Sequence, residues 1–251
     1  MSDTFLAVRG LRKQFDSTVV LDGVDMDVER GLVTTIIGKS GTGKSVLLKC
    51  LAGIIQADDG EILRNGETFI PGSNPACRDR LRFSYMFQNN ALFDSLTAFE
   101  NVALPLHEAG LLNPAEIRAK VEGLLEELDL KEAMSRYPGE LSGGMQKRVA
   151  FARALVTDPE LVLFDEPTTG LDPERKYGIF DLIARYRAEF GFTALLVSHD
   201  IPEVFQISDR LLWLNAGRGC FSGSPEDLEA KKEQDVMDFV NKASYRPKRT
   251  I

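Results

Sequence analysis

The sequence contains no run of the roughly 18 consecutive apolar residues that a membrane-spanning helix requires. Its longest apolar runs, at residues 32–37 and 194–197, have the length of a strand. The first ten residues, MSDTFLAVRG, lack both the basic segment and the long apolar segment of a secretory signal. We therefore expect a chain that does not span a membrane and stays in the cytosol.

Cysteine and histidine are scarce. The three cysteines, Cys50, Cys77 and Cys220, are far apart and do not have the spacing of a metal site. The two histidines, His107 and His199, are too few for a multi-histidine metal site. We expect reduced, partly buried thiols and no metal site built from these residues.

The chain also lacks an excess of positive charge. It has 30 Lys and Arg against 38 Asp and Glu, which gives a net charge of −8 and argues against broad binding to nucleic-acid phosphates. What is present is an ordinary globular composition, with 43% hydrophobic and 27% charged residues in 251. This is enough for one large α/β domain or two small ones, and it excludes disorder over the full length.

Short strand patterns alternate with helical patterns along the chain. The stretch from residue 5 to 28 predicts three short strands, FLAVRG, RKQF and VVLDGVDMDV. Later strands are expected at residues 33–37, 61–63 (in a hairpin), 82–87, 161–164, 193–197, 210–214 and 218–221. Helices are expected at residues 45–54, 142–156 and 174–190, and residues 97–129 are expected to be helical with Pro105 and Pro114 as punctuation. Such alternation predicts a largely parallel sheet covered on both faces.

One part of the chain departs from this alternation. Residues 89–158 are mostly helical and are interpreted as a subdomain inserted into a single domain that spans residues 1–251. The core is then assigned to residues 1–88 and 159–225, and a C-terminal helix and tail to residues 226–251. The last eleven residues, NKASYRPKRTI, are expected to be frayed.

A phosphate-binding loop is the first chemical motif. The sequence GKSGTGKS matches G-x-x-x-x-G-K-[ST] between an expected strand and an expected helix. Its glycines let backbone N–H groups face a phosphate, and the helix directs its positive end at the same anion. Lys44 is expected to contact the β- and γ-phosphates, and the Ser45 hydroxyl to bind Mg²⁺. The nucleotide-binding residues predicted here are Gly38, Lys39, Ser40, Gly41, Thr42, Gly43, Lys44, Ser45 and Val46.

A pair of acids is the second motif. The run LVLFDEP delivers Asp165 and Glu166 to the carboxyl edge of the expected sheet, where ligands bind in such folds. Asp165 is expected to reach Mg²⁺, and Glu166 to orient or deprotonate the attacking water. An acidic pair after a strand is commonly a turn or a helix cap, but the phosphate loop favours a catalytic role.

The third motif is LSGGMQ, followed by the basic helical stretch KRVAFARAL. Ser142, Gly143 and Gly144 form a second anion site at a helix N-terminus. Here the sequence resembles the ATP-binding-cassette (ABC) superfamily, whose signature is LSGGQ. In that family the signature of one subunit completes the ATP site of the other, so the resemblance implies a head-to-tail homodimer. The glutamine of the signature is displaced to Gln146, with Met145 in its place.

Four further residues match landmarks of the family, in the expected order. By resemblance, Phe15 stacks on adenine, although the same pattern fits an ordinary core phenylalanine. Gln88 contacts Mg²⁺ and the attacking water, Asp172 lies in the loop through which subunits communicate, and His199 contacts the γ-phosphate. His107 matches no landmark and is expected to be structural.

The resemblance also implies a fold and an activity. The fold is an ABC-type P-loop NTPase of the α/β class, with a RecA-like mostly parallel core sheet, an N-terminal antiparallel β subdomain and an inserted α-helical subdomain. The activity is ATP hydrolysis with ATP and Mg²⁺, coupled to transmembrane permease subunits. The implied location is the cytoplasmic face of an inner membrane. Val46, where many relatives have a hydroxyl residue, and Met145 are departures that should not abolish hydrolysis.

Peripheral segments narrow the resemblance further. The segments YMFQNNALFDSLTAFENVALPLHEAG and SHDIPEVFQISDR look like those of ATPases in Mla-type systems, which move phospholipids across the envelope of Gram-negative bacteria. This resemblance implies an MCE-domain lipid-binding protein and a small accessory subunit as partners. ATPases of polar amino-acid importers share the same core and are the alternative.

Other classes of ABC protein fit less well. Translation-type members resemble two cassettes in one chain, whereas this sequence has one phosphate loop and one signature. Chromosome and repair members have a long coiled coil between those motifs, but Lys44 and Ser142 are only 98 positions apart (142 − 44). A scaffold without turnover would be expected to lack Glu166 or His199, and both are present.

Overall fold

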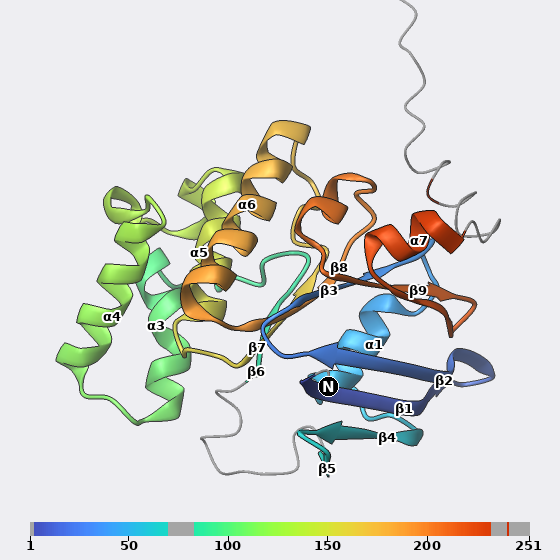
Figure 1. Cartoon of the computed structure of the whole chain (residues 1–251). Helices are drawn as coiled ribbons and strands as arrows, with labels where there is room; N and C mark the ends of the chain where they lie inside the picture. The colour runs from blue at the N-terminus through green and yellow to red at the C-terminus, as the bar shows by residue number, and fades with distance from the viewer. Residues whose placement is uncertain (1–2, 70–82, 232–239, 241–251) are drawn as a thin grey trace, which may run out of the picture.

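The structure is a computed structural model that describes residues 3–69, 83–231 and 240. A six-stranded sheet lies at its centre, in the order β10-β9-β3-β8-β7-β6 (Figure 1). Its strands are β3 (Val33–Ile37), β6 (Phe83–Met86), β7 (Leu161–Asp165), β8 (Thr193–Val197), β9 (Arg210–Asn215) and β10 (Arg218–Gly223). All neighbouring pairs are parallel except β10 with β9. This confirms the predicted mostly parallel α/β core.

The central strands are buried on both faces, which explains their continuous apolar sequences. Alternate residues of each strand belong to different parts of the core. Leu161 and Leu163 of β7 pack on one side of the sheet, and Val162 and Phe164 pack on the other. One side faces α1 and the second sheet, and the other faces α3, α5 and α6. The strands therefore have no polar face.

A second, antiparallel sheet has the order β2-β1-β4-β5. It consists of β1 (Thr4–Phe15), β2 (Thr18–Glu29), β4 (Asp59–Arg64) and β5 (Glu67–Thr68). The prediction of two separate strands within β1 was wrong. The strand continues through Gly10, which has a φ of 59°, and the pairing with β2 shifts register between Val8 and Leu11. Gly10 is thus part of a bulge within one strand, and its N–H donates to Asp25 Oδ1 at 2.7 Å.

Helix α1 (Lys44–Leu51) lies between the two sheets (Figure 1). Its apolar residues Leu47, Leu48 and Leu51 are fully buried, in one cluster with Phe5 of β1 and Leu163 of β7. The helix ends three residues earlier than its pattern predicts. Because both sheets pack on this one helix, they fix the loop that precedes it.

The helical segment lies beside the core sheet and contains α3 (Ala98–Ala109), α4 (Pro114–Glu127) and α5 (Gly143–Leu155). The helical stretch expected over residues 97–129 consists of two helices, because Gly110 ends α3 with a φ of 63° and Asn113 caps α4. Of the two prolines expected to punctuate it, Pro114 begins α4 and Pro105 lies inside α3. Asn101 is fully buried and donates from its side chain to the carbonyls of residues 93, 96 and 97. The subdomain boundaries at residues 89 and 158 stay a prediction.

The remaining helices are α6 (Pro173–Phe190) and α7 (Pro225–Lys231), with short 3₁₀ helices at Lys131–Ala133, Pro138–Glu140 and Glu203–Ile207. Most of the expected C-terminal helix and tail lies outside the described residues, as does Cys77. Within the described ranges, none of the helices has the length and apolar character to cross a membrane.

Candidate functional site

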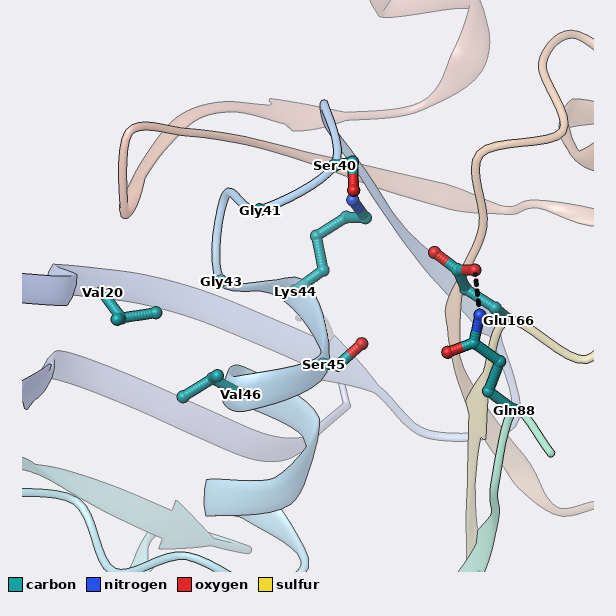
Figure 2. A pocket seen from close by; sticks show the side chains of 9 residues that line it. All are labelled: Val20, Ser40, Gly41, Gly43, Lys44, Ser45, Val46, Gln88 and Glu166. Carbon is teal, nitrogen blue, oxygen red and sulfur yellow. Dashed lines mark hydrogen bonds between the residues drawn. The ribbon is translucent and has the colours of Figure 1, made fainter. Parts of the chain in front are cut away.

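An open cavity of about 300 Å³ lies where β3 and β7 end and α1 begins (Figure 2). It is lined by Val20, Ser40, Gly41, Gly43, Lys44, Ser45, Val46, Gln88 and Glu166. These residues come from the phosphate loop, the segment after β6 and the end of β7, together with one residue of β2. The structure thus brings together most of the residues that the first two motifs predicted.

Glycine is required at two positions of the loop. A Cβ at Gly38 would lie 2.4 Å from the Leu214 carbonyl oxygen, and one at Gly43 would lie 2.8 Å from the carbonyl oxygen of Val20. Gly43 also has a φ of 99°. The loop is therefore packed directly against β9 and β2, and Val20 is a lining residue that no motif predicts.

Lys44 is folded back into its own loop. Its Nζ donates to the carbonyl oxygens of Gly38 at 2.9 Å and Lys39 at 2.8 Å, and the residue is only 6% exposed. Burial lowers the pKa of Lys44, whereas the carboxylates of Glu166 and Asp165 oppose that shift. The loop thus holds a buried ammonium against two of its own carbonyl oxygens.

Asp165 links the loop to the sheet. Its Oδ1 accepts from the Ser45 hydroxyl at 2.7 Å, and its Oδ2 accepts from the Tyr85 hydroxyl at 2.8 Å. Hydroxyl and carboxylate oxygens are the hard donors that Mg²⁺ prefers, so this pair fits the predicted metal. Tyr85 was not predicted, because its role follows from the pairing of β6 with β7 and not from a motif.

Glu166 is the centre of a polar cluster. Its Oε2 accepts from Gln88 Nε2 at 3.0 Å and from Thr169 Oγ1 at 3.0 Å, and lies 3.3 Å from His199 Nδ1. The hydrogen bond from His199 holds the pKa of Glu166 below its ordinary value, and Glu166 raises the pKa of His199. Glu166 has a φ of 48°, a left-handed conformation that is costly for this residue type. The arrangement keeps an ionised carboxylate directed at the cavity (Figure 2).

Several predicted residues lie outside this cavity lining. Phe15 is at the end of β1 and 42% exposed, so it is not a core phenylalanine, and Lys13 Nζ lies 5.2 Å from its ring centroid. Asp172 caps α6 by accepting from the Arg175 N–H at 3.1 Å. Gly38, Lys39 and Thr42 belong to the loop, where the Thr42 hydroxyl donates to Lys39 O at 2.9 Å.

The third motif begins α5 and does not line the cavity. Ser142 is the N-cap of that helix and accepts from the Met145 N–H at 3.3 Å, with Gly143 and Gly144 following it. The displaced Gln146 donates from Nε2 to the carbonyl of Pro138 at 2.9 Å. The glutamine therefore braces the turn that precedes Ser142.

Comparisons with known proteins agree with this geometry. Residues 21–169 match the ABC transporter family. The chain is 36% identical to the intermembrane phospholipid transport system ATP-binding protein MlaF of Haemophilus influenzae, over 99% of this chain and 95% of that protein. It is 39% identical to MlaF of Escherichia coli, over 88% of this chain and 83% of that protein. It is also 39% identical to the methionine import ATP-binding protein MetN of Rhizobium johnstonii, over 94% of this chain and 65% of that protein.

Two solved structures have similar folds. One is the ATP-binding cassette MJ0796 in a dimeric post-hydrolysis state bound to ADP and Pi, with a TM-score of 0.78, 28% identity, and coverage of 87% of this chain and 98% of that chain. The other is cbiO1 of Clostridium perfringens, part of the transporter complex cbiONQ, with a TM-score of 0.81, 30% identity, and 95% coverage of each chain.

Proposed function

The chain belongs to the ABC transporter family, and we propose that two copies of it share their ATP sites and drive a phospholipid transporter. Family membership makes it an ATP-binding subunit that hydrolyses ATP to ADP and phosphate and couples this reaction to transport.

One observation carries the shared-site proposal. The chain has two anion-binding turns, but only the turn at Lys44 lines the cavity, whereas Ser142 starts α5 elsewhere. A second copy placed head to tail would bring its Ser142, Gly143 and Gly144 to the γ-phosphate held at the first turn. The solved relative in a dimeric state supports this arrangement, since its chain has the same fold.

Each of the following residues is assigned one role in ATP hydrolysis. Lys44 turns its ammonium from the loop carbonyls to the β- and γ-phosphates, and Glu166 orients the attacking water and accepts its proton. His199 holds the γ-phosphate, and Phe15 stacks on the adenine at the end of the hairpin that contributes Val20. Bound by Ser45, Asp165 and Gln88, Mg²⁺ would offset negative charge on the phosphate oxygens.

The proposed partners follow from the relatives. The MlaF proteins are named as ATP-binding parts of intermembrane phospholipid transport systems. We assign this chain the same role, as a homodimer on the cytoplasmic face of an inner membrane, with permease subunits, an MCE-domain lipid-binding protein and a small accessory subunit. The methionine-import relative supports an importer ATPase as the alternative.

Size-exclusion chromatography with ATP tests the shared site. Glu166→Gln should elute as a dimer with ATP, because it binds nucleotide without releasing phosphate. Combining Ser142→Glu with Glu166→Gln should restore the monomer, because a carboxylate would then face the γ-phosphate. The control combines Ser142→Ala with Glu166→Gln; it removes only the N-cap of α5 and should leave most of the dimer. A dimer that survives Ser142→Glu unchanged would overturn the shared site.

Copurification from membranes tests the transported substrate. The tagged chain should retain a permease and an MCE-domain protein, and phospholipid should be found in the purified complex. Recovery of a permease with an amino-acid-binding protein, and without an MCE-domain protein, would establish the importer instead.

A further inference from the structure

A cluster of polar groups that do not line the cavity adjoins the proposed catalytic residues along the chain. At its centre is Asp200, which is 8% exposed and directly follows His199. Its Oδ2 accepts from the Thr168 hydroxyl at 2.5 Å, and its Oδ1 pairs with Lys176 Nζ. Thr168 is 1% exposed, and Lys176 exposes 23% of its side chain. The cluster is thus a nearly buried carboxylate with one ammonium partner and one hydroxyl donor.

Each of the three members lies in a segment that carries a proposed functional residue. Thr168 lies two positions after Glu166, and Asp200 lies one position after His199. Lys176 lies in the first turn of α6, where its N–H donates to the carbonyl of Asp172 at 3.0 Å. Asp200 therefore connects the segment that contains His199 to the start of α6 through Lys176. It also connects it to the segment that contains Glu166 through Thr168.

The backbone at residue 200 is also held in place. The Asp200 N–H donates to Ser198 Oγ at 3.0 Å, and its carbonyl accepts from the Val204 N–H at 3.0 Å. The His199 imidazole, in contrast, exposes 51% of its side chain. In the described part of the chain, its contact with Glu166 Oε2 at 3.3 Å is the one ion pair recorded for it. The position of His199 is thus set largely by the backbone that Asp200 anchors.

We propose that Lys176 is a positioning residue for hydrolysis, which acts through Asp200 to hold His199 against Glu166 and ties that contact to the start of α6. This inference rests on the proposed roles of Glu166 and His199. Removing the ammonium leaves a nearly buried carboxylate without its counter-charge, so the residue 198–200 turn has to move toward solvent or toward another donor. A displacement of about 1 Å at a reacting group is enough to reduce turnover strongly.

Steady-state kinetics of Lys176→Met tests the role. Methionine keeps the length and apolar stem of lysine without the charge, so kcat is expected to fall about tenfold while KM for ATP changes little. The affinity for a fluorescent ATP analogue should stay within about twofold, since the phosphate loop is untouched. Lys176→Arg keeps the positive charge and should recover most of the turnover.

A double-mutant cycle separates the pair from its surroundings. Asp200→Asn keeps an oxygen for Thr168, and we expect its effect and that of Lys176→Met to be far from additive. Lys131→Met is the matched control, because it breaks an exposed pair with Glu126 outside the site. It should leave kcat unchanged.

The outcomes are distinct. Two results would overturn the positioning role directly: wild-type kcat in Lys176→Met, or additive effects in the double-mutant cycle. The role would also be overturned if nucleotide affinity and melting temperature fell in proportion to kcat. Wild-type turnover in Glu166→Gln would instead overturn the proposed function on which it rests. A loss of kcat that arginine restores, with the affinity for the ATP analogue retained, establishes the inference.

Discussion

The ammonium of Lys147 donates a 2.8 Å hydrogen bond to the backbone carbonyl of Gln88, whose side chain donates to Glu166. Lys147 is 4% exposed and lies in α5, the helix that starts at Ser142. Arg153 of the same helix donates to the carbonyl of Asn90 at 2.6 Å and to that of Ala91 at 2.7 Å. The helix that begins at the proposed second anion-binding turn therefore also holds the segment whose Gln88 contacts Glu166.

Lys147→Met is expected to reduce ATP turnover while it leaves nucleotide binding intact. The Gln88 carbonyl loses its buried donor, which should lower the free energy of unfolding by about 1–3 kcal/mol and loosen the contact with Glu166. Turnover and chemical denaturation measure the two effects. Lys120→Met, which breaks the exposed pair with Asp158 in the same segment, is the control and should change neither. Unchanged turnover in Lys147→Met would show that Gln88 is held by other contacts.

Glu166→Gln is expected to lower kcat by about 10²–10⁴-fold, because an amide cannot accept the proton of the attacking water. ATP affinity should stay close to wild type, since Lys44 and the loop N–H groups are unchanged. Phosphate release measures turnover, and fluorescence titration measures binding. Turnover at the wild-type rate would reject Glu166 as the catalytic carboxylate.

Lys44→Ala is expected to abolish measurable nucleotide binding. The variant removes the ammonium that donates to the carbonyls of Gly38 and Lys39 at the start of the phosphate loop. The charge-assisted contact that this ammonium would make with phosphate is lost as well. Because Lys44 is buried, the melting temperature of the protein without nucleotide needs to be measured in parallel. Normal binding by a folded Lys44→Ala protein would contradict the loop assignment.

The cysteines should differ in reactivity. Burial raises the pKa of the Cys50 thiol from 9.0 to about 11, while Cys220 is exposed. At pH 8 the thiolate fraction of Cys50 is then about 100-fold lower than that of a thiol with the ordinary pKa. Peptide mass spectrometry after timed alkylation should show Cys220 modified before Cys50. Rapid modification of Cys50 would indicate that α1 opens away from the sheets.

The sequence predicts the elements of the site that depend on spacing along the chain. The phosphate loop, the Asp165–Glu166 pair and the strands of the core sheet were all identifiable, because each follows from a local pattern of glycines, acids or apolar residues. The expected alternation of strands and helices also gave the mostly parallel sheet.

Contacts made between distant segments were not predictable. Tyr85 reaches Asp165 because β6 pairs with β7, and Lys176 reaches Asp200 because α6 packs beside the turn after β8. Neither residue belongs to a motif whose spacing would indicate a partner. The strand β1 was predicted as two strands, because a glycine with positive φ, such as Gly10, is compatible with both a break and a bulge.

The left-handed backbone of Glu166 has an evolutionary consequence. Glycine adopts a φ of 48° without strain, so Glu166→Gly would relieve the turn at the end of β7 while it removed the carboxylate. Selection against backbone strain and selection for a working transporter therefore act in opposite directions at this single position.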